Sequence, residues 1–239
     1  MTGLITAIQT LSILPVRGKG CEDFSRSLPW FPVVGLLLGL ILSGIAGFCR
    51  EIPAEATAVL ILLAGVLLTR GFHLDGLADC ADGFGGGYTR ERVLEIMKDS
   101  STGAFGAISI VLSLLLKWVA LKHLIETGNL TIIVLAYVAS RALQVEQMVR
   151  LPYARVSGTA ASFVEGATPT HRLIALATAM TAALLLAGIF GVLYLSLAWL
   201  LAFLFGAYCK NRVGGITGDL LGTTSELTET LILFLPFFL

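Results

Sequence analysis

The chain has 239 residues, of which 56% are hydrophobic and 13% are charged, and its mean hydropathy is +0.88. A soluble domain carries about 25% charged residues, so this composition lacks the polar surface that a water-soluble globule needs. The formal net charge is zero, and no overall positive field favours nucleic acid. The composition therefore predicts an integral membrane protein, and we expect a single domain over residues 1–239.

Apolar runs along the chain are long enough to cross a bilayer, because a span needs about 20 mostly apolar residues. The expected spans are 30–48, 54–69, 104–121, 130–149, 173–191 and 194–208. Residues 1–16 are expected to lie flat as an interfacial helix, and the stretch 227–239 is a short last span or a re-entrant segment. The runs lack the alternation of a barrel strand, so we predict an all-α, polytopic helical bundle with six to seven spans.

The distribution of Lys and Arg predicts the orientation, because short cytoplasmic loops retain an excess of both. Most of these residues fall on one side, which places the N-terminus in the cytoplasm. The same side holds three long connections, 71–103, 150–172 and 210–226. These connections carry most of the residues with chemical potential, so we expect a site on the cytoplasmic face.

The first of these connections contains three acidic residues, Asp75, Asp79 and Asp82, spaced i, i+4 and i+7. If the stretch is helical, the three carboxylates project from one face and repel each other. A hard divalent cation such as Mg²⁺ would reverse that repulsion. The glycines that follow, including Gly85 and Gly86, let the backbone approach a ligand or turn sharply. The alternative is a solvated acidic loop with a glycine-rich turn.

Residues 88–99 read as an amphipathic helix, which ends in Lys98 and Asp99. Lys98 could counter phosphate charge, and Asp99 could rejoin the metal site at the start of the next span. Arg141 lies within a span, where a charged side chain is usually functional or paired. Glu146 is its candidate partner in the same span, although the two are five residues apart and poorly aligned.

The other two connections each carry one candidate. Arg155 can make bidentate contacts to phosphate, and equally it can serve as an orientation signal or a lipid contact. Asp219 stands among glycines in 214–222, which suits a substrate or metal site, or an acidic N-cap of a helix. His73 and His171 lack the spacing of a zinc motif.

Several segments together resemble the cobalamin synthase family, the adenosylcobinamide-GDP ribazoletransferases. The segments are 73–79, 82–83, 94–99, 103–106, 152–155 and 214–219. The resemblance implies a multi-pass enzyme of the cell inner membrane that acts late in cobalamin assembly. Such enzymes use Mg²⁺ to join adenosylcobinamide-GDP to α-ribazole or α-ribazole 5′-phosphate, releasing GMP. A looser similarity to CDP-alcohol phosphotransferases, in Asp79, Asp82 and Gly83, extends to the chemistry but not to the fold.

With that chemistry, a ribazole hydroxyl attacks the phosphorus attached to cobinamide, and positioning and charge neutralisation drive the transfer. Asp82 is expected to take the hydroxyl proton, with His73 as an alternative base. The residues expected in the site are the metal ligands Asp75, Asp79, Asp82 and Asp99, the catalytic residues Asp79, Asp82 and Asp219, and the substrate-binding residues Gly85, Gly86, Lys98, Arg141 and Arg155.

Two other classes of function are compatible with the sequence. A transporter for a corrinoid or a metal ion would place ionisable groups near the middle of the bilayer. Here the acids gather in loops at one face, which favours the enzyme. A scaffold subunit would not need convergent carboxylates. Association as a homo-oligomer, or with other late-pathway enzymes, is compatible with all of these functions.

Overall fold

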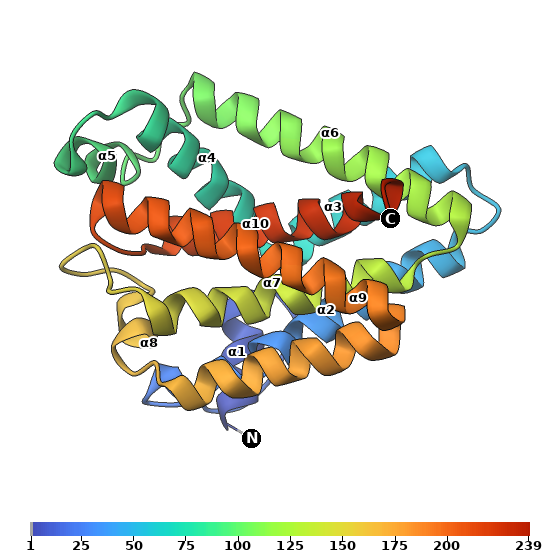
Figure 1. Ribbon diagram of the computed structural model, residues 1–239, viewed down its shortest axis with the longest axis horizontal. Helices are drawn as coiled ribbons and strands as arrows, with labels where there is room; N and C mark the ends of the chain where they lie inside the picture. Colours follow the sequence, from blue (N-terminus) through green and yellow to red (C-terminus); the bar gives the residue numbers. More distant parts are fainter. Residues whose placement is uncertain (1) are drawn as a thin grey trace.

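The computed structural model describes residues 2–239, and within that range it contains helices and no strand (Figure 1). A single parallel bridge joins Tyr153 to Ile216. The elements in chain order are α1 (Thr2–Leu11), η1 (Phe24–Trp30), α2 (Phe31–Phe48), α3 (Ala54–Thr69), α4 (Phe72–Gly86), α5 (Arg90–Ile96), α6 (Ala104–Thr127), α7 (Thr131–Arg150), α8 (Ala161–Glu165), α9 (Pro169–Val213), α10 (Gly218–Phe234) and η2 (Leu235–Phe237). The predicted all-α class is confirmed.

Helix α7 forms the centre of the bundle, because nearly all of its residues are buried, against α2, α9 and α10. Two glycines of α2, Gly35 and Gly39, allow close contact with it. A Cβ on Gly35 would collide with the Tyr137 carbonyl, and one on Gly39 would lie 2.7 Å from Val134 Cα. Small residues four apart are a common contact surface between membrane helices, where close backbone approach replaces the hydrophobic effect.

Helix α9 is a hairpin of two helical arms. Gly188 leaves the helical conformation, with φ 59° and ψ −137°, which favours glycine. A Cβ on Gly191 would collide with the Ala183 carbonyl, although a straight helix would hold these residues about 12 Å apart. Figure 1 shows the two arms running in opposite directions. The apolar runs 173–191 and 194–208 correspond to these arms.

The turn between α3 and α4 bends the chain by 88°. Arg70 and Gly71 both adopt the left-handed conformation there, with φ values of 56° and 66°. By length and hydropathy, four described helices could cross a membrane, or five if α3 and α4 together form one broken span. The membrane class is supported, whereas the count of six to seven spans and the cytoplasmic N-terminus stay predictions.

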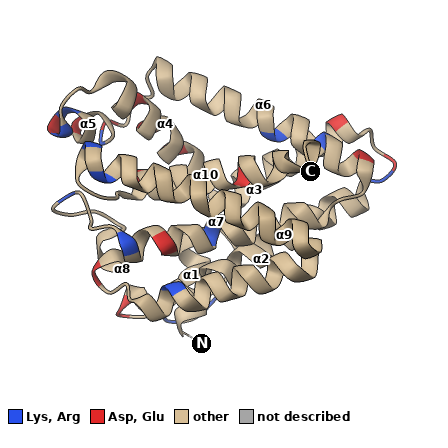
Figure 2. Ribbon diagram, viewed as in Figure 1, with Lys and Arg blue, Asp and Glu red and all other residues tan. Residues whose placement is uncertain are grey.

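The surface of the bundle fits a lipid environment. Charged residues gather toward the two ends of the bundle, and the belt between them carries few (Figure 2). Large apolar side chains are exposed on this belt, among them Leu67 of α3, Ile108 of α6 and Leu185 of α9. Such extensive exposed apolar area is untenable in water and expected in a bilayer.

The boundaries predicted for the third connection, 210–226, are wrong in part. Helix α9 continues to Val213, and α10 begins at Gly218 rather than near residue 227. Thr217 caps α10 by accepting the Leu220 N–H at 3.3 Å. The first turns of α10 are rich in Gly, Thr and Ser, and Thr224 Oγ1 donates back to the Leu220 carbonyl at 2.8 Å. A scan for apolar runs therefore misses the start of this buried helix.

Candidate active site

The acidic stretch folds as helix α4, which is the condition under which its three aspartates are expected to share a face, and α4 packs against the start of α10. Gly76 permits this contact, because a Cβ there would lie 2.7 Å from the Asp219 carbonyl oxygen. Thr223 Oγ1 donates to the Gly76 carbonyl at 3.0 Å and joins the two helices. The contact brings Asp75 and Asp79 close to Asp219. The charges of Asp75 and Asp219 act on Asp79, and the charge of Asp75 also acts on Asp219.

Arg155 faces Asp219 from the connection between α7 and α8. Its Nη2 donates to Asp219 Oδ2 at 2.7 Å, and both side chains are about one-fifth exposed. The bridge between Tyr153 and Ile216 aligns the two connections, and the Ala154 N–H donates to the Ile216 carbonyl at 2.9 Å. Two of the predicted site residues therefore meet, although they come from different connections.

Two further arginines hold this end of the bundle together. Arg90 of α5 donates through Nε to the Val213 carbonyl at 2.8 Å and through Nη2 to the Ala154 carbonyl at 3.0 Å. Arg212 of α9 donates to the Gly87 carbonyl at 2.8 Å. Sequence reasoning counted both only as orientation signals, because nothing in a single sequence shows which carbonyls an arginine will reach.

The electrostatics of the site are dominated by carboxylates. Asp75, Asp79 and Asp219 lie within reach of one another's charge, and Arg155 is the cation that acts on Asp79 and Asp219. Burial raises the pKa of Asp219, and the Arg155 guanidinium opposes that rise. Among residues 2–239, no three His, Cys, Asp or Glu side chains stand ready to hold a metal ion.

Asp82 has a different environment from the other acids. Its two carboxylate oxygens accept the N–H groups of Gly103 at 2.7 Å and of Gly106 at 2.9 Å. The side chain is 9% exposed and caps the N-terminus of α6, where a negative charge is favourable. Its predicted roles as metal ligand and base stay predictions, and this contact gives it a structural role that the sequence did not indicate.

The predicted residues between α5 and α6 are exposed. Asp99 lies in the connection before α6, and its Oδ1 accepts the Ser101 N–H at 2.9 Å. Hydrogen bonds from Ser101 hold the pKa of Asp99 below its ordinary value. Lys98 is exposed at the end of the segment that includes α5. Within residues 2–239, neither side chain forms a hydrogen bond or an ion pair with Asp75, Asp79 or Asp219.

Gly85 and Gly86, predicted to approach substrate, lie against other helices. A Cβ on Gly85 would lie 2.7 Å from the Phe105 ring of α6, and one on Gly86 would lie 3.3 Å from Ile96. A side chain at position 85 would therefore have to displace the Phe105 ring of α6. Substrate contact by the backbone here stays a prediction.

A cavity of about 270 Å³ opens beside the carboxylates. Asp75 and Asp219 line it on one side, and the rings of Phe31, Phe72 and Phe163 line it from α2, α4 and α8. A space with an apolar wall and a few convergent polar groups is the usual form of a small-molecule site.

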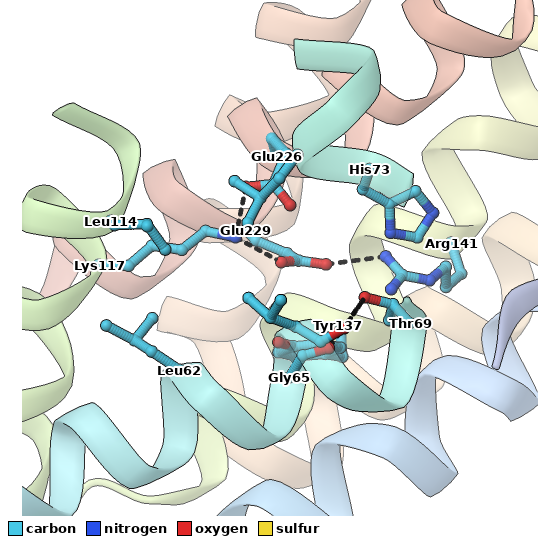
Figure 3. A pocket seen from close by; sticks show the side chains of 12 residues that line it. Leu62, Gly65, Thr69, His73, Leu114, Lys117, Tyr137, Arg141, Glu226 and Glu229 are labelled. Carbon is cyan, nitrogen blue, oxygen red and sulfur yellow. Dashed lines mark hydrogen bonds and ion pairs between the residues drawn. The ribbon is translucent and has the colours of Figure 1, made fainter. Parts of the chain in front are cut away.

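Behind the site lies a buried network of charged residues that the sequence analysis did not identify (Figure 3). Lys117 Nζ of α6 is 2.8 Å from Glu226 Oε2 and 2.7 Å from Glu229 Oε2, both on α10. Arg141 Nη1 of α7 is 2.7 Å from Glu229 Oε1 and also donates to Ser140 Oγ. Two bases and two acids therefore balance, around a cavity of only about 30 Å³.

This network corrects the predicted pairing of Arg141. Its partner is Glu229 of α10, whereas Glu146 instead lies 3.7 Å from Arg172. The Arg141 side chain is fully buried, and its contact with substrate stays a prediction. Lys117 is likewise buried. Lys117, Arg141 and Glu229 all stand within apolar stretches, and this was the available signal, since such groups must pair.

His73, the alternative base, is buried on α4. Figure 3 shows it beside Arg141, and its Nε2 is 3.2 Å from Gln144 Nε2. It lines the small cavity with Lys117 and Glu229 rather than the larger cavity beside Asp219. Its role as the base stays a prediction.

The chain is similar to one known protein family over nearly its whole length. Residues 3–237 match the cobalamin-5-phosphate synthase family. A protein of Chlorobium phaeobacteroides named adenosylcobinamide-GDP ribazoletransferase is 47% identical, over 97% of this chain and 96% of the relative. Relatives of the same name are 44% identical in Prosthecochloris aestuarii, over 97% and 96%, and 41% identical in Syntrophobacter fumaroxidans, over 89% and 86%. No solved structure matches the chain.

Proposed function

The chain belongs to the cobalamin-5-phosphate synthase family, and we propose on that basis that it transfers the adenosylcobinamide phosphate of adenosylcobinamide-GDP to α-ribazole or its 5′-phosphate. A ribose hydroxyl attacks the phosphorus bound to cobinamide, a new phosphodiester bond forms, and the bond to GMP breaks. The hydroxyl proton passes to a carboxylate, and the product is adenosylcobalamin or its 5′-phosphate. We place the reaction on the cytoplasmic face of the inner membrane.

The observation that carries this proposal is the meeting of Asp219 with Arg155 beside Asp75 and Asp79. Asp219 and Asp75 line a cavity of about 270 Å³, and Arg155 contacts Asp219 from the connection between α7 and α8. Transfer of a substituted phosphate needs little covalent participation by the protein, and depends on positioning and on neutralising charge. Carboxylates and an arginine are the groups that this task requires.

Each residue has a role that its position supports. Arg155, one-fifth exposed, binds a phosphate oxygen through the guanidinium that now contacts Asp219. Asp219, at the start of α10, accepts the proton of the attacking hydroxyl, and its raised pKa suits a general base. Asp75 lines the cavity next to it and holds the hydroxyl in place.

The donor set fits Mg²⁺ in its chemistry, because carboxylate oxygens are the ligands that this hard cation takes. Asp75 and Asp79 would hold it, and the repulsion between their charges favours an added cation. When bound, Mg²⁺ supplies neutralisation of the diphosphate charge as GMP leaves. Two carboxylates are enough for this ion when substrate phosphate supplies further oxygens, and no cluster of three stands ready among residues 2–239.

The test is GMP release by the purified protein in bilayers, with adenosylcobinamide-GDP and α-ribazole as substrates. Asp219→Asn should lower kcat by about 100-fold or more, the range for loss of a general base. Glu95→Gln is the matched control, because Glu95 is exposed on α5 and its ion pair within residues 2–239 is with its helix neighbour Arg92. EDTA should abolish turnover, and added Mg²⁺ should restore it.

Absence of GMP release by the wild-type protein would refute the proposed reaction. Near-normal turnover of Asp219→Asn would refute the role of Asp219 as the base. Uptake of a corrinoid into liposomes, without GMP release, would instead favour a transporter.

A further inference from the structure

The cavity beside Asp219 has a rigid aromatic wall. Phe163 packs edge-on against Phe31, with ring centroids 5.9 Å apart, and against Phe24 at 5.3 Å. Phe31 and Phe163 are buried at 2% and 6% exposure, so neighbouring side chains hold their rings in place. Phe72 of α4 completes the wall. Rings held in this way suit a flat aromatic ligand, which stacks or packs edge-on without large ordering costs.

Gln144 of α7 also lines this cavity, and its side chain holds a buried polar atom without a partner. Gln144 Nε2 donates to the Leu221 carbonyl at 3.3 Å and lies 3.2 Å from His73 Nε2, which fixes the orientation of the amide. Gln144 Oε1 is buried and has no hydrogen-bond partner among the described residues. A buried acceptor left unpaired costs free energy, so a ligand donor that reaches this oxygen, after a small shift of the amide toward the cavity, would stabilise it.

The size of the cavity selects between the two substrates. A volume of about 270 Å³ exceeds the roughly 150 Å³ that accommodates one benzene ring. It suits a bicyclic base with part of its ribose, and it is too small for a corrin ring with its side chains. Its lining includes no Lys or Arg, so it does not suit the diphosphate.

We propose that this cavity binds the planar aromatic base of the ribazole against Phe31, Phe72 and Phe163, an inference that rests on the proposed function. A ribose hydroxyl then donates to Gln144 Oε1. The ribose then lies toward Asp75 and Asp219, where the attacking hydroxyl meets its base. The corrinoid substrate stays outside the cavity, on the Arg155 side. The aromatic wall sets which bases the enzyme accepts.

The experiment measures steady-state GMP release while each substrate is varied in turn. Phe163→Leu should raise the KM for α-ribazole about tenfold, the size expected for loss of one aromatic contact. Gln144→Leu should raise the same KM about fivefold, as for loss of a neutral hydrogen bond. The KM for adenosylcobinamide-GDP should change less than twofold in both variants. Phe190→Leu, on the lipid-exposed turn of α9, is the control.

A second measurement separates this inference from the proposed reaction. Calorimetry follows binding of free α-ribazole to the wild-type protein and to the variants, without turnover. Weaker binding to both variants supports the aromatic site, even if no GMP is released. Binding and KM for α-ribazole within twofold of wild type in both variants would overturn it. An equal rise in both KM values would also overturn it, because that pattern indicates general damage.

Discussion

The buried charge network makes a quantitative prediction for stability. Lys117 is 6% exposed, and its Nζ contacts Glu226 at 2.8 Å and Glu229 at 2.7 Å. In Lys117→Met, Glu229 keeps Arg141, whereas Glu226 keeps only the Ser113 hydroxyl at 3.3 Å. Removing one partner of a buried ion pair costs about 3–5 kcal/mol, since it leaves an uncompensated charge. That is a large part of a stability of about 5–15 kcal/mol.

The assay is reversible unfolding in mixed micelles, followed by circular dichroism. Lys117→Met should lower the unfolding free energy by about 3–5 kcal/mol. The double variant Lys117→Met with Glu226→Gln removes both charges, and should recover about 1–3 kcal/mol relative to the sum of the single variants. Lys122→Met is the matched control, because its pair with Glu55 is partly exposed, and we expect stability near wild type.

Two results would refute this reasoning. One is a Lys117→Met protein within about 1 kcal/mol of wild type, which would mean that water or rearrangement screens the freed carboxylate. The other is a double variant as unstable as the sum of the single variants, which would mean that packing rather than charge balance accounts for the loss.

Three shorter predictions concern the site. Gly76→Leu places a Cβ 2.7 Å from the Asp219 carbonyl and should lower kcat/KM for GMP release about 100-fold by displacing α10; a change under twofold would contradict this. Arg155→Gln removes the cation that lowers the pKa of Asp219, so this pKa should rise further. The acidic limb of the plot of kcat/KM against pH should then move to higher pH. A limb that does not move would exclude Asp219 as the titrating group. Asp82→Asn cannot accept both N–H groups and should lower the unfolding free energy by about 1–3 kcal/mol; lost activity at unchanged stability would instead support a catalytic role.

The elements of the fold were largely predictable, because long apolar runs in a bilayer must satisfy their backbone groups as helices. The spacing of Asp75, Asp79 and Asp82 indicated a shared face only if the stretch was helical, and α4 supplies that helix. The start of α10 was missed, since its first turns are polar and its burial depends on α4 and α7.

The contacts within the site were less predictable, because they join residues far apart in the chain. The sequence indicated that Asp219 and Arg155 were candidates, but the bridge that brings them together depends on how two connections align. Asp82 looked equivalent to Asp79, and only the position of α6 separates their roles. For Arg141, helix neighbours in sequence were a poor guide, since its partner lies on α10.

The bridge between Tyr153 and Ile216 has a consequence for how the molecule can vary. It closes a long loop of the chain that contains α8 and α9, and within that loop α9 packs along α7. A Cβ on Gly188 would meet nothing within 4 Å, so the turn between the two arms of α9 is open to change. This turn can therefore vary in length while the two connections that carry Arg155 and Asp219 keep their alignment.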